Sequence, residues 1–220
     1  MQLDYSAILP FWSVFLEGAW MTVKFSLISL ILGMILGIAG GICKTSGIKT
    51  LQVVAGLYTW IFRGTPLLVQ LFIIYFGLAQ VGLKFEPLEA GIIGMALNTG
   101  AYITEIIRSG IQAVDKGQTE ASVSLGMSKP VMMLRVIGPQ AIKIAIPPLV
   151  NQFIMTIKNS SMVSTITITE LFRTGEMVIT TTFRPLETYT VIGAIYLVMT
   201  SILMLAARKL EKGLTAHDRA

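Results

Sequence analysis

Charged residues are scarce in this chain of 220 residues. Asp, Glu, Lys and Arg together make up 13% of it, where ordinary globular domains have roughly 25%. Hydrophobic residues make up 54%, and the mean hydropathy is +0.74. A disordered or nucleic-acid-binding chain would need far more charge than the net +5 found here. The composition therefore indicates a protein embedded in the lipid bilayer, with no nucleic acid among its partners.

Cysteine and histidine are almost absent. Each occurs once, as Cys43 and His217, so the chain forms no internal disulfide and offers few groups for metal or triad chemistry. The motif Gly-x-x-x-x-Gly-Lys-Ser/Thr, which holds nucleotide phosphates, is also missing. We therefore expect no catalytic residue, no metal and no cofactor in this chain, and we do not expect it to be an ATPase.

Long apolar runs are plentiful. A helix needs about 20 residues to cross a hydrocarbon core of about 30 Å. Three uncharged runs provide that length: residues 25–43, 64–83 and 188–207. Two weaker stretches are residues 90–104 and 144–157, of which the second contains Pro147 and Pro148. The pattern predicts an all-α protein with five membrane-spanning helices in a single transmembrane domain, residues 1–220.

The positive charges indicate an orientation, because Lys and Arg gather in cytoplasmic loops. If the N-terminus is outside, the inner segments carry twelve of them: Lys44, Lys49, Arg63, Arg108, Lys116, Lys129, Arg135, Lys143, Arg208, Lys209, Lys212 and Arg219. The outer segments then carry four: Lys84, Lys158, Arg173 and Arg184. Asp4 and Glu17 precede the first basic residue, Lys24, unlike the positive start of a secretory signal. We expect a retained N-terminus outside and a C-terminus inside.

The longest inner segment, residues 108–143, is too polar to enter lipid and too short to form a domain. Residues 118–125 favour a helix, Gly126 suits the left-handed position that follows a helix, and Ser128 with Pro130 suits the first turn of a new helix. The pattern predicts a helix, a tight turn and a second helix. Spacing alone fits equally well an amphipathic hairpin that rests on the bilayer.

Residues of this segment resemble a known motif. The EAA loop of ATP-binding-cassette (ABC) importer permeases reads Glu-Ala-Ala, three residues, Gly, nine residues, Ile, one residue, Leu-Pro. The corresponding residues here are Glu120, Ala121, Ser122, Gly126, Val136, Gly138 and Pro139. Ser122 replaces the second alanine, Val136 the isoleucine and Gly138 the leucine. Four further segments resemble the polar amino acid permease family: RGTPLL at residues 63–68, NTGAY at 98–102 with Glu105, DKGQ at 115–118 and PQA at 139–141. The resemblance covers nearly the whole chain and implies the type I ABC importer permease fold in a bacterial inner membrane.

The resemblance also implies a role for the hairpin, residues 115–139. Its first helix would dock in a groove of a separate ATPase subunit, with Glu120 contacting that partner or capping a backbone group, Ala121 keeping the face small and Gly126 forming the turn. For Glu120 alone, a solvated helix face is the alternative. The implied partners are a second permease copy or homologue, two ATP-binding subunits that use ATP and Mg, and an external solute-binding protein. Cargo would move by alternating access.

The fourth span carries the main candidate binding residues. Helical spacing puts Asn151 and Lys158 on one line and Gln152 and Asn159 about 100° round from it, with Thr156 adjacent. A lysine within a span costs roughly 2.5 to 3.5 kcal/mol on insertion scales. In one interpretation, the amides pack between helices and Lys158 reaches the outer interface. In the other, Lys158 attracts the α-carboxylate of an amino acid while Gln152 and Asn159 contact its side chain, and the resemblance favours this second interpretation.

The third span has a smaller polar face of Asn98, Tyr102 and Glu105. Asn98 and Tyr102 are candidates to line the same path, whereas an inner ion pair or helix-end contact is favoured for Glu105. Gln70 in the second span either faces the path or bonds a neighbouring helix. Glycines 33, 37, 40 and 41 and the twelve methionines indicate close packing or lipid contact.

The candidate side chains bear on the cargo. A cavity for arginine or lysine would be expected to hold a carboxylate, whereas amides suit an uncharged polar side chain. The resemblance to bacterial glutamine permeases, at residues 1–8, 151–152 and 183–187, points the same way, so glutamine is the expected cargo. Glutamate, cystine, arginine and histidine remain alternatives, because Asn159 stands where many relatives have an acidic residue. The rival class is a secondary transporter, which would be expected to show more spans or internal repeats.

Overall fold

The computed structural model describes the backbone of residues 3–216 and the side chains of residues 3–209, so His217 lies outside the described residues. Within that range the regular elements are all helical, which confirms the all-α prediction. In chain order they are η1 (Leu9–Phe11), α1 (Trp12–Thr45), α2 (Lys49–Gly64), α3 (Leu67–Phe72), η2 (Ile73–Gly77), α4 (Leu78–Gln80), α5 (Pro87–Gln112), α6 (Lys116–Ser124), α7 (Lys129–Met132), η3 (Met133–Ile137), α8 (Gly138–Asn159), η4 (Ser160–Ile166), α9 (Leu171–Thr182) and α10 (Pro185–Ala216).

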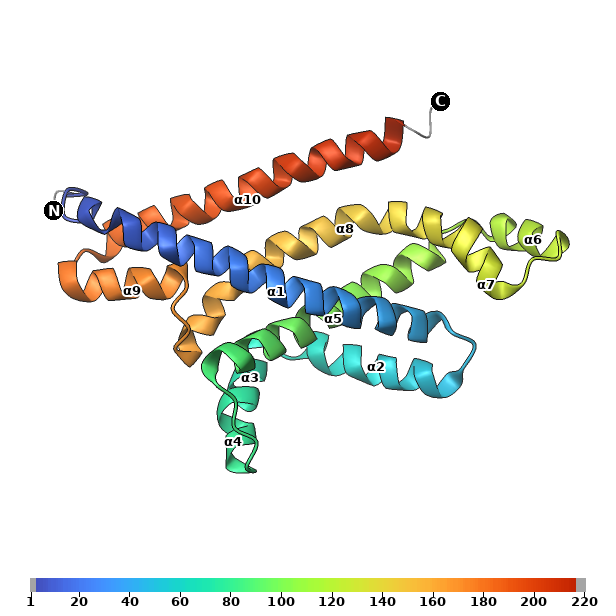
Figure 1. Cartoon of the computed structure of the whole chain (residues 1–220), viewed down its shortest axis with the longest axis horizontal. Helices are drawn as coiled ribbons and strands as arrows, with labels where there is room; N and C mark the ends of the chain where they lie inside the picture. Colours follow the sequence, from blue (N-terminus) through green and yellow to red (C-terminus); the bar gives the residue numbers. More distant parts are fainter. Residues whose placement is uncertain (1–2, 217–220) are drawn as a thin grey trace.

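Long helices run along one axis of the molecule (Figure 1). The hairpin of α6 and α7 projects at one end, which we call the hairpin end, and the start of α1 lies with α9 at the other, the far end. Four helical stretches of the described chain are long and apolar enough to cross a membrane: Leu9–Thr45, Pro87–Gln112, Lys129–Ile166 and Pro185–Lys209. Lys49–Gly64 with Leu67–Gln80 makes a bent pair that brings the number to five.

The second span departs from the expected straight run over residues 64–83. Instead, α2 ends at Gly64, and the next helix leaves at an angle of 106°. Thr65 is extended and Pro66 has no N–H to continue the helix, so the chain turns here. The predicted run is thus one unbroken helical stretch over Leu67–Gln80, but it is shorter than predicted, and it pairs with α2, which the prediction had left outside the span.

The first span is longer than predicted. Helix α1 starts at Trp12 rather than near residue 25, because the side chains of Glu17 and Lys24 lie on its exposed side and do not interrupt it. Helix α8 likewise continues through Pro147 and Pro148.

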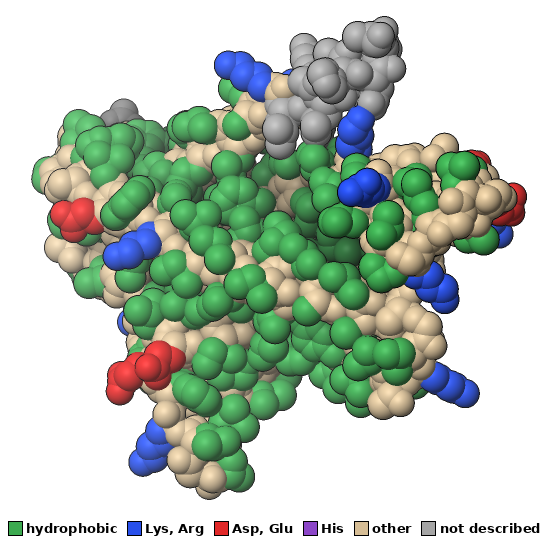
Figure 2. All heavy atoms as spheres, turned by 45° about the vertical axis from the view of Figure 1, so that its right-hand side comes forward, with side chains coloured by type: hydrophobic (Ala, Val, Ile, Leu, Met, Phe, Trp, Pro, Cys, Tyr) green, Lys and Arg blue, Asp and Glu red, His purple; other side chains and the backbone are tan. Residues whose placement is uncertain are grey.

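Close packing of α1 on α5 forms the centre of the molecule. A Cβ added at Gly33 would lie 3.0 Å from Thr99 Cγ2, and one added at Gly41 would lie 2.5 Å from Ile107 Cγ2. These small residues let the two backbones approach, as small-residue faces do in membrane helix pairs. The packing interpretation of the glycines is confirmed at these positions. Elsewhere the surface is mostly apolar, with charged side chains near the margins of the face in Figure 2, as expected for contact with lipid or partner helices.

Candidate functional site: hairpin, bend and two cavities

The hairpin has the predicted helix, turn and helix. Asp115 caps α6 by accepting a 2.7 Å hydrogen bond from Gly117 N. At the other end of α6, Gly126 has φ +71°, Gly126 N donates to Val123 O and Met127 N donates to Ser122 O. This pair of bonds is the Schellman termination, which needs a left-handed residue at the glycine position. Gly126 therefore fixes the turn by its backbone conformation.

The outer surface of the hairpin is exposed and partly apolar. Glu120 and Ala121 are exposed on α6, whereas the neighbouring Ser122 is buried and bonds Gln118 O. Large apolar side chains are also exposed, with Leu125 77% and Leu134 78% accessible. A stiff hairpin with an apolar exposed face is suited to contact another protein.

A polar brace supports the bend between α2 and α3. Because Pro66 has no N–H, the carbonyl of Phe62 lacks the donor that would normally come four residues later. Gln70 Nε2 donates to Phe62 O at 2.9 Å, and Asn98 Nδ2 donates to the same oxygen at 3.1 Å. Asn98 Nδ2 also donates to Gln70 Oε1 at 3.0 Å. The two amides thus replace the missing helix bond and tie α5 to the bend.

The brace settles the alternatives for Gln70, which bonds neighbouring helices and is only 5% exposed. Asn98 is equally buried and belongs to the same brace. Tyr102, one turn further along α5, is 38% exposed. The structure therefore separates Asn98 from Tyr102, although both were candidates for one path.

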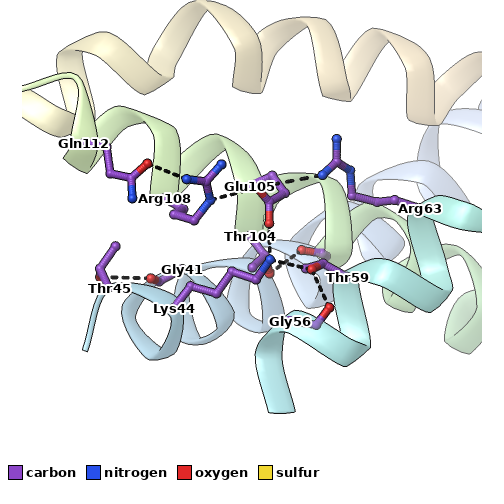
Figure 3. Close-up of polar contacts among 11 residues, drawn as sticks. Gly41, Lys44, Thr45, Gly56, Thr59, Arg63, Thr104, Glu105, Arg108 and Gln112 are labelled. Atoms are coloured by element: carbon purple, nitrogen blue, oxygen red, sulfur yellow. Dashed lines mark hydrogen bonds and ion pairs between the residues drawn. The ribbon is translucent and has the colours of Figure 1, made fainter. Parts of the chain in front are cut away.

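Glu105 is the centre of a charge cluster that joins α1, α2 and α5 (Figure 3). Its carboxylate pairs with Lys44, with Arg108 Nε at 2.8 Å and more loosely with Arg63 Nη1 at 3.8 Å. Lys44 also donates to Thr59 Oγ1 at 2.6 Å. The predicted ion pair of Glu105 is confirmed, but three cations surround one carboxylate, so the cluster carries an excess of two positive charges.

One cavity opens beside this cluster, toward the hairpin end of α5 and α8. Its volume is about 390 Å³. Its lining residues are Arg63, Tyr102, Glu105, Ile106, Ser109, Gly110, Ala113, Ile144 and Pro148. We call it the inner cavity, because the hairpin end is the expected cytoplasmic end. The Arg63 guanidinium lies 5.4 Å from the centre of the Tyr102 ring, within the range of a cation–π contact.

A second cavity, of about 310 Å³, lies between the end of α8, α9 and α10; we call it the outer cavity. Its lining residues are Lys158, Ser161, Phe172, Tyr189, Ile192, Gly193 and Tyr196. Phe172 and Tyr189 stack with ring centres 5.9 Å apart. Sequence reasoning missed these aromatic residues, since they come from two helices that only the fold brings together.

The other candidates on α8 take different positions. Lys158 and Asn151 are exposed, Asn159 is partly buried, and Gln152 is 9% exposed. Thr156, next to Gln152 on the helix surface, is fully buried and lies 3.3 Å from Thr99 of α5, oxygen to oxygen. The predicted polar residues of α8 therefore lie on two different sides of the helix. The side with Thr156 packs on α5, and the side with Lys158 is exposed.

Behind the outer cavity lies a buried carboxylate, Glu170. It accepts hydrogen bonds from Tyr196 Oη at 2.8 Å, from Arg173 N at 2.9 Å and from Thr22 Oγ1 at 3.3 Å. Burial raises the pKa of the Glu170 carboxyl above its usual range, although these hydrogen bonds act in the opposite direction. Glu170 thereby connects α1, α9 and α10 at the far end.

Membrane-length helices, cavities between them that each contain a cation, and an exposed stiff hairpin are typical of a membrane transport subunit. The chain belongs to the family of binding-protein-dependent transport system inner membrane components, whose family model matches residues 29–216. It is accordingly a multi-pass protein of the inner membrane.

Individual relatives cover almost the entire chain. The arginine transport system permease protein ArtQ of Bacillus subtilis is 40% identical over 219 residues, 99% of this chain and 100% of that protein. The glutamine transport system permease protein GlnP of Escherichia coli K12 is 37% identical over 214 residues, 96% of this chain and 98% of that protein. A crystal structure of an amino acid ABC transporter with histidines matches with a TM-score of 0.92 at 41% identity, covering 96% of this chain and 99% of that one. The MetNI methionine ABC transporter, at 18% identity and a TM-score of 0.79, covers 93% and 97% and shares the fold. The predicted ABC permease fold is confirmed.

Proposed function

We propose that this chain is the membrane-spanning subunit of an ATP-driven importer of polar amino acids, with glutamine as its cargo. The observation that carries the proposal is its similarity, over nearly the full length, to permeases named for glutamine and arginine transport. The chain itself would bind no nucleotide and no other cofactor, so ATP and Mg would act in separate subunits. Transport by alternating access then requires a contact that transmits movement from those subunits to this one.

The hairpin, about residues 115–139, is the proposed contact with the ATPase. Its exposed Glu120 and Ala121 lie on α6, and the left-handed Gly126 holds α6 at a fixed angle to α7. A rigid turn transmits force better than a flexible loop, since less of the displacement is lost. The proposed complex has two ATPase subunits, two permease chains, either copies or homologues, and a solute-binding protein on the outer side.

The outer cavity is the proposed cargo site. Lys158 would pair with the α-carboxylate of the amino acid, while Gln152 and Asn159 of the same helix and Tyr102 of α5 are the remaining candidates for contact along the path. Asn98, also predicted as a binding residue, would reach the path only by giving up its hydrogen bonds in the brace. Among the described residues that line the outer cavity, Lys158 is the one charged side chain. A site with a cation and no carboxylate suits glutamine better than arginine, whose guanidinium would be left unpaired.

Arginine is the second candidate cargo, because ArtQ carries that name at 40% identity. The two candidates are separated by reconstituting the chain with its ATPase and binding-protein partners in proteoliposomes and measuring ATP-dependent uptake of each of the twenty amino acids. Glutamine uptake that needs ATP and the binding protein supports the proposal. Uptake by this chain alone, driven by an ion gradient, would show a secondary transporter instead.

The role of Lys158 is tested in the same system. We expect Lys158→Ala to lower cargo-stimulated ATP hydrolysis and uptake by about tenfold, the effect of losing one charge-assisted hydrogen bond. Arg173→Gln removes a cation on α9 whose partner is Glu176, and serves as the control. If Lys158→Ala reduces unstimulated ATP hydrolysis as much as stimulated hydrolysis, Lys158 has a packing role.

A further inference from the structure

The inner cavity contains a cation that the charge cluster does not neutralise. Lys44 and Arg108 hold Glu105 by close contacts, and their side chains are 16% and 31% exposed. Arg63 lies 3.8 Å from the carboxylate, is 43% exposed and lines the cavity. Since one carboxylate balances one charge, the guanidinium of Arg63 remains available for a second anion. Its planar fork of N–H groups matches the two oxygens of a carboxylate.

Two sequence motifs converge to build this cavity. Arg63 is the last basic residue before the bend of α2, and the Gln70 and Asn98 brace fixes that bend. Tyr102 and Glu105 follow Asn98 on α5 and hold Arg63 from two sides, by its ring and its carboxylate. The brace therefore positions the guanidinium beside the cavity.

One exposed face of α8 connects the two cavities. Residues on this face are spaced four, three, four and three apart and are all exposed: Ile144, Pro148, Asn151, Met155 and Lys158. Pro148 lines the inner cavity and Lys158 lines the outer one. Ten residues of helix separate them, which is about 15 Å at the helical rise. A cation therefore lies near each end of this face: Lys158 on α8 itself, and Arg63 of α2 in the inner cavity.

From these contacts we infer that the inner cavity is a second binding station for the amino acid, in which Arg63 receives the α-carboxylate after it leaves Lys158. Every amino acid has this carboxylate, so the station recognises cargo without regard to its side chain. Ser109 adds a hydroxyl, and Ile106, Ile144 and Pro148 provide apolar walls. The cavity volume lies within the range of small-molecule sites. Two separated stations allow each to bind weakly enough for release. The inference depends on the proposed function.

The test uses the full complex in proteoliposomes with binding protein and L-glutamine in the lumen and ATP in the bath. ATP then acts only on complexes whose ATPase, and therefore whose hairpin, faces the bath. L-glutamine added to the bath should inhibit lumen-stimulated ATP hydrolysis by occupying the inner station. L-glutaminamide, which lacks the α-carboxylate, should inhibit at least about tenfold more weakly. If the uptake survey selects arginine, L-arginine and L-argininamide replace this pair.

Variants assign the inhibition to Arg63. Arg63→Gln should raise the inhibition constant of L-glutamine in the bath by a factor at least about tenfold larger than the factor by which it raises the KM for L-glutamine in the lumen. Lys158→Ala should show the reverse, a larger effect on the KM than on the inhibition constant. Arg63→Lys should keep part of the inhibition. The matched control is Arg173→Gln, since Arg173 is also 43% exposed and ion-paired, and it should leave the inhibition constant unchanged. If Arg63→Gln fails to assemble, Tyr102→Leu and Arg63→Lys make the same comparison.

Several outcomes would overturn the inference. Equal inhibition by L-glutaminamide, or an unchanged inhibition constant in Arg63→Gln, means that Arg63 does not bind the carboxylate. Inhibition by bath sulfate as strong as that by the amino acid shows a general anion site, and inhibition that vanishes in vesicles rich in anionic phospholipid shows a lipid phosphate site. Failure of the proposed function is seen earlier, because then no luminal amino acid stimulates ATP hydrolysis at all.

Discussion

Glu170 is a carboxyl group buried at the far end, where α1, α9 and α10 meet. Its pKa in the folded protein is raised above the ordinary value of 4.5 because burial disfavours the charged form. Its contribution to stability is therefore fully present below about pH 4.5 and is lost as the pH rises through the folded pKa. The protein keeps this group because the same carboxylate joins three helices.

The direction of this pKa shift can be tested by thermal unfolding of the purified protein between pH 4 and pH 9. The difference in Tm between Glu170→Gln and the unsubstituted protein should shift in favour of the variant as the pH rises, since the amide never pays the cost of ionisation. Glu176→Gln, at an exposed carboxylate that pairs with Arg173, is the control for replacing a carboxyl group by an amide. A difference in Tm that stays constant with pH would contradict the raised pKa.

The need for glycine at position 126 comes from the backbone conformation alone. Its φ of +71° costs an L-residue about 1 to 2 kcal/mol, and a β-branched residue more. Gly126→Val should therefore distort the turn and abolish cargo-stimulated ATP hydrolysis while the chain still inserts into the membrane. Gly126→Asn is the matched comparison, since asparagine tolerates the left-handed region, and it should keep most of the coupling. Normal transport by Gly126→Val would show that the turn does not transmit movement.

At the scale of elements, the bend between α2 and α3 shows what a sequence pattern can and cannot give. Pro66 marks a helix boundary, and the apolar residues after it form one helical stretch, but the apolar pattern did not show that α2 makes a bent pair with them. The 106° turn depends on Gln70 and Asn98 supplying donors to Phe62 O. The Asn98 bond joins residues that are 36 positions apart in the chain, and no local periodicity reveals such a contact.

Other elements were predictable because their signals are local. The turn of the hairpin follows from Gly126 and from Ser128 with Pro130, and each is a statement about neighbouring residues. The packing glycines of α1 follow from their spacing. By contrast, the outer cavity combines Lys158 with aromatic residues of α9 and α10, and Asn98 turned toward the brace rather than toward Tyr102. Choosing which polar side chain faces a cavity requires the angle of each helix about its own axis.

The brace itself is testable as a coupled pair. Gln70→Leu and Asn98→Leu each leave Phe62 O with one donor fewer and should destabilise the protein by about 1 to 3 kcal/mol. Because the two side chains bond each other and the same carbonyl, the double variant should lose less than the sum, with a coupling of about 0.5 to 3 kcal/mol. Chemical unfolding in detergent measures both quantities. Strict additivity would show that the amides act independently.

At the scale of the whole molecule, the proposed direction of transport depends on which end of the chain faces the cytoplasm. Twelve of the sixteen loop cations were assigned to the side of the hairpin, and an ATPase can contact Glu120 and Ala121 only from the cytoplasm. The helices place the hairpin and the turn between α9 and α10 at opposite ends of the molecule (Figure 1). The chain has a single cysteine, Cys43, so its replacement by serine gives a cysteine-free background in which new thiols can be placed at either end and labelled.

In the Cys43→Ser background, Phe183→Cys places a thiol at the far end, where Phe183 is 82% exposed, and Thr119→Cys places one on the exposed hairpin. A membrane-impermeant maleimide should label Phe183→Cys in intact spheroplasts and Thr119→Cys only after the membrane is opened. Each variant is the other's control for thiol reactivity, because both must react in detergent. Labelling of Thr119→Cys from outside would reverse the orientation, and because ATP is cytoplasmic, the hairpin would then have no ATPase to contact.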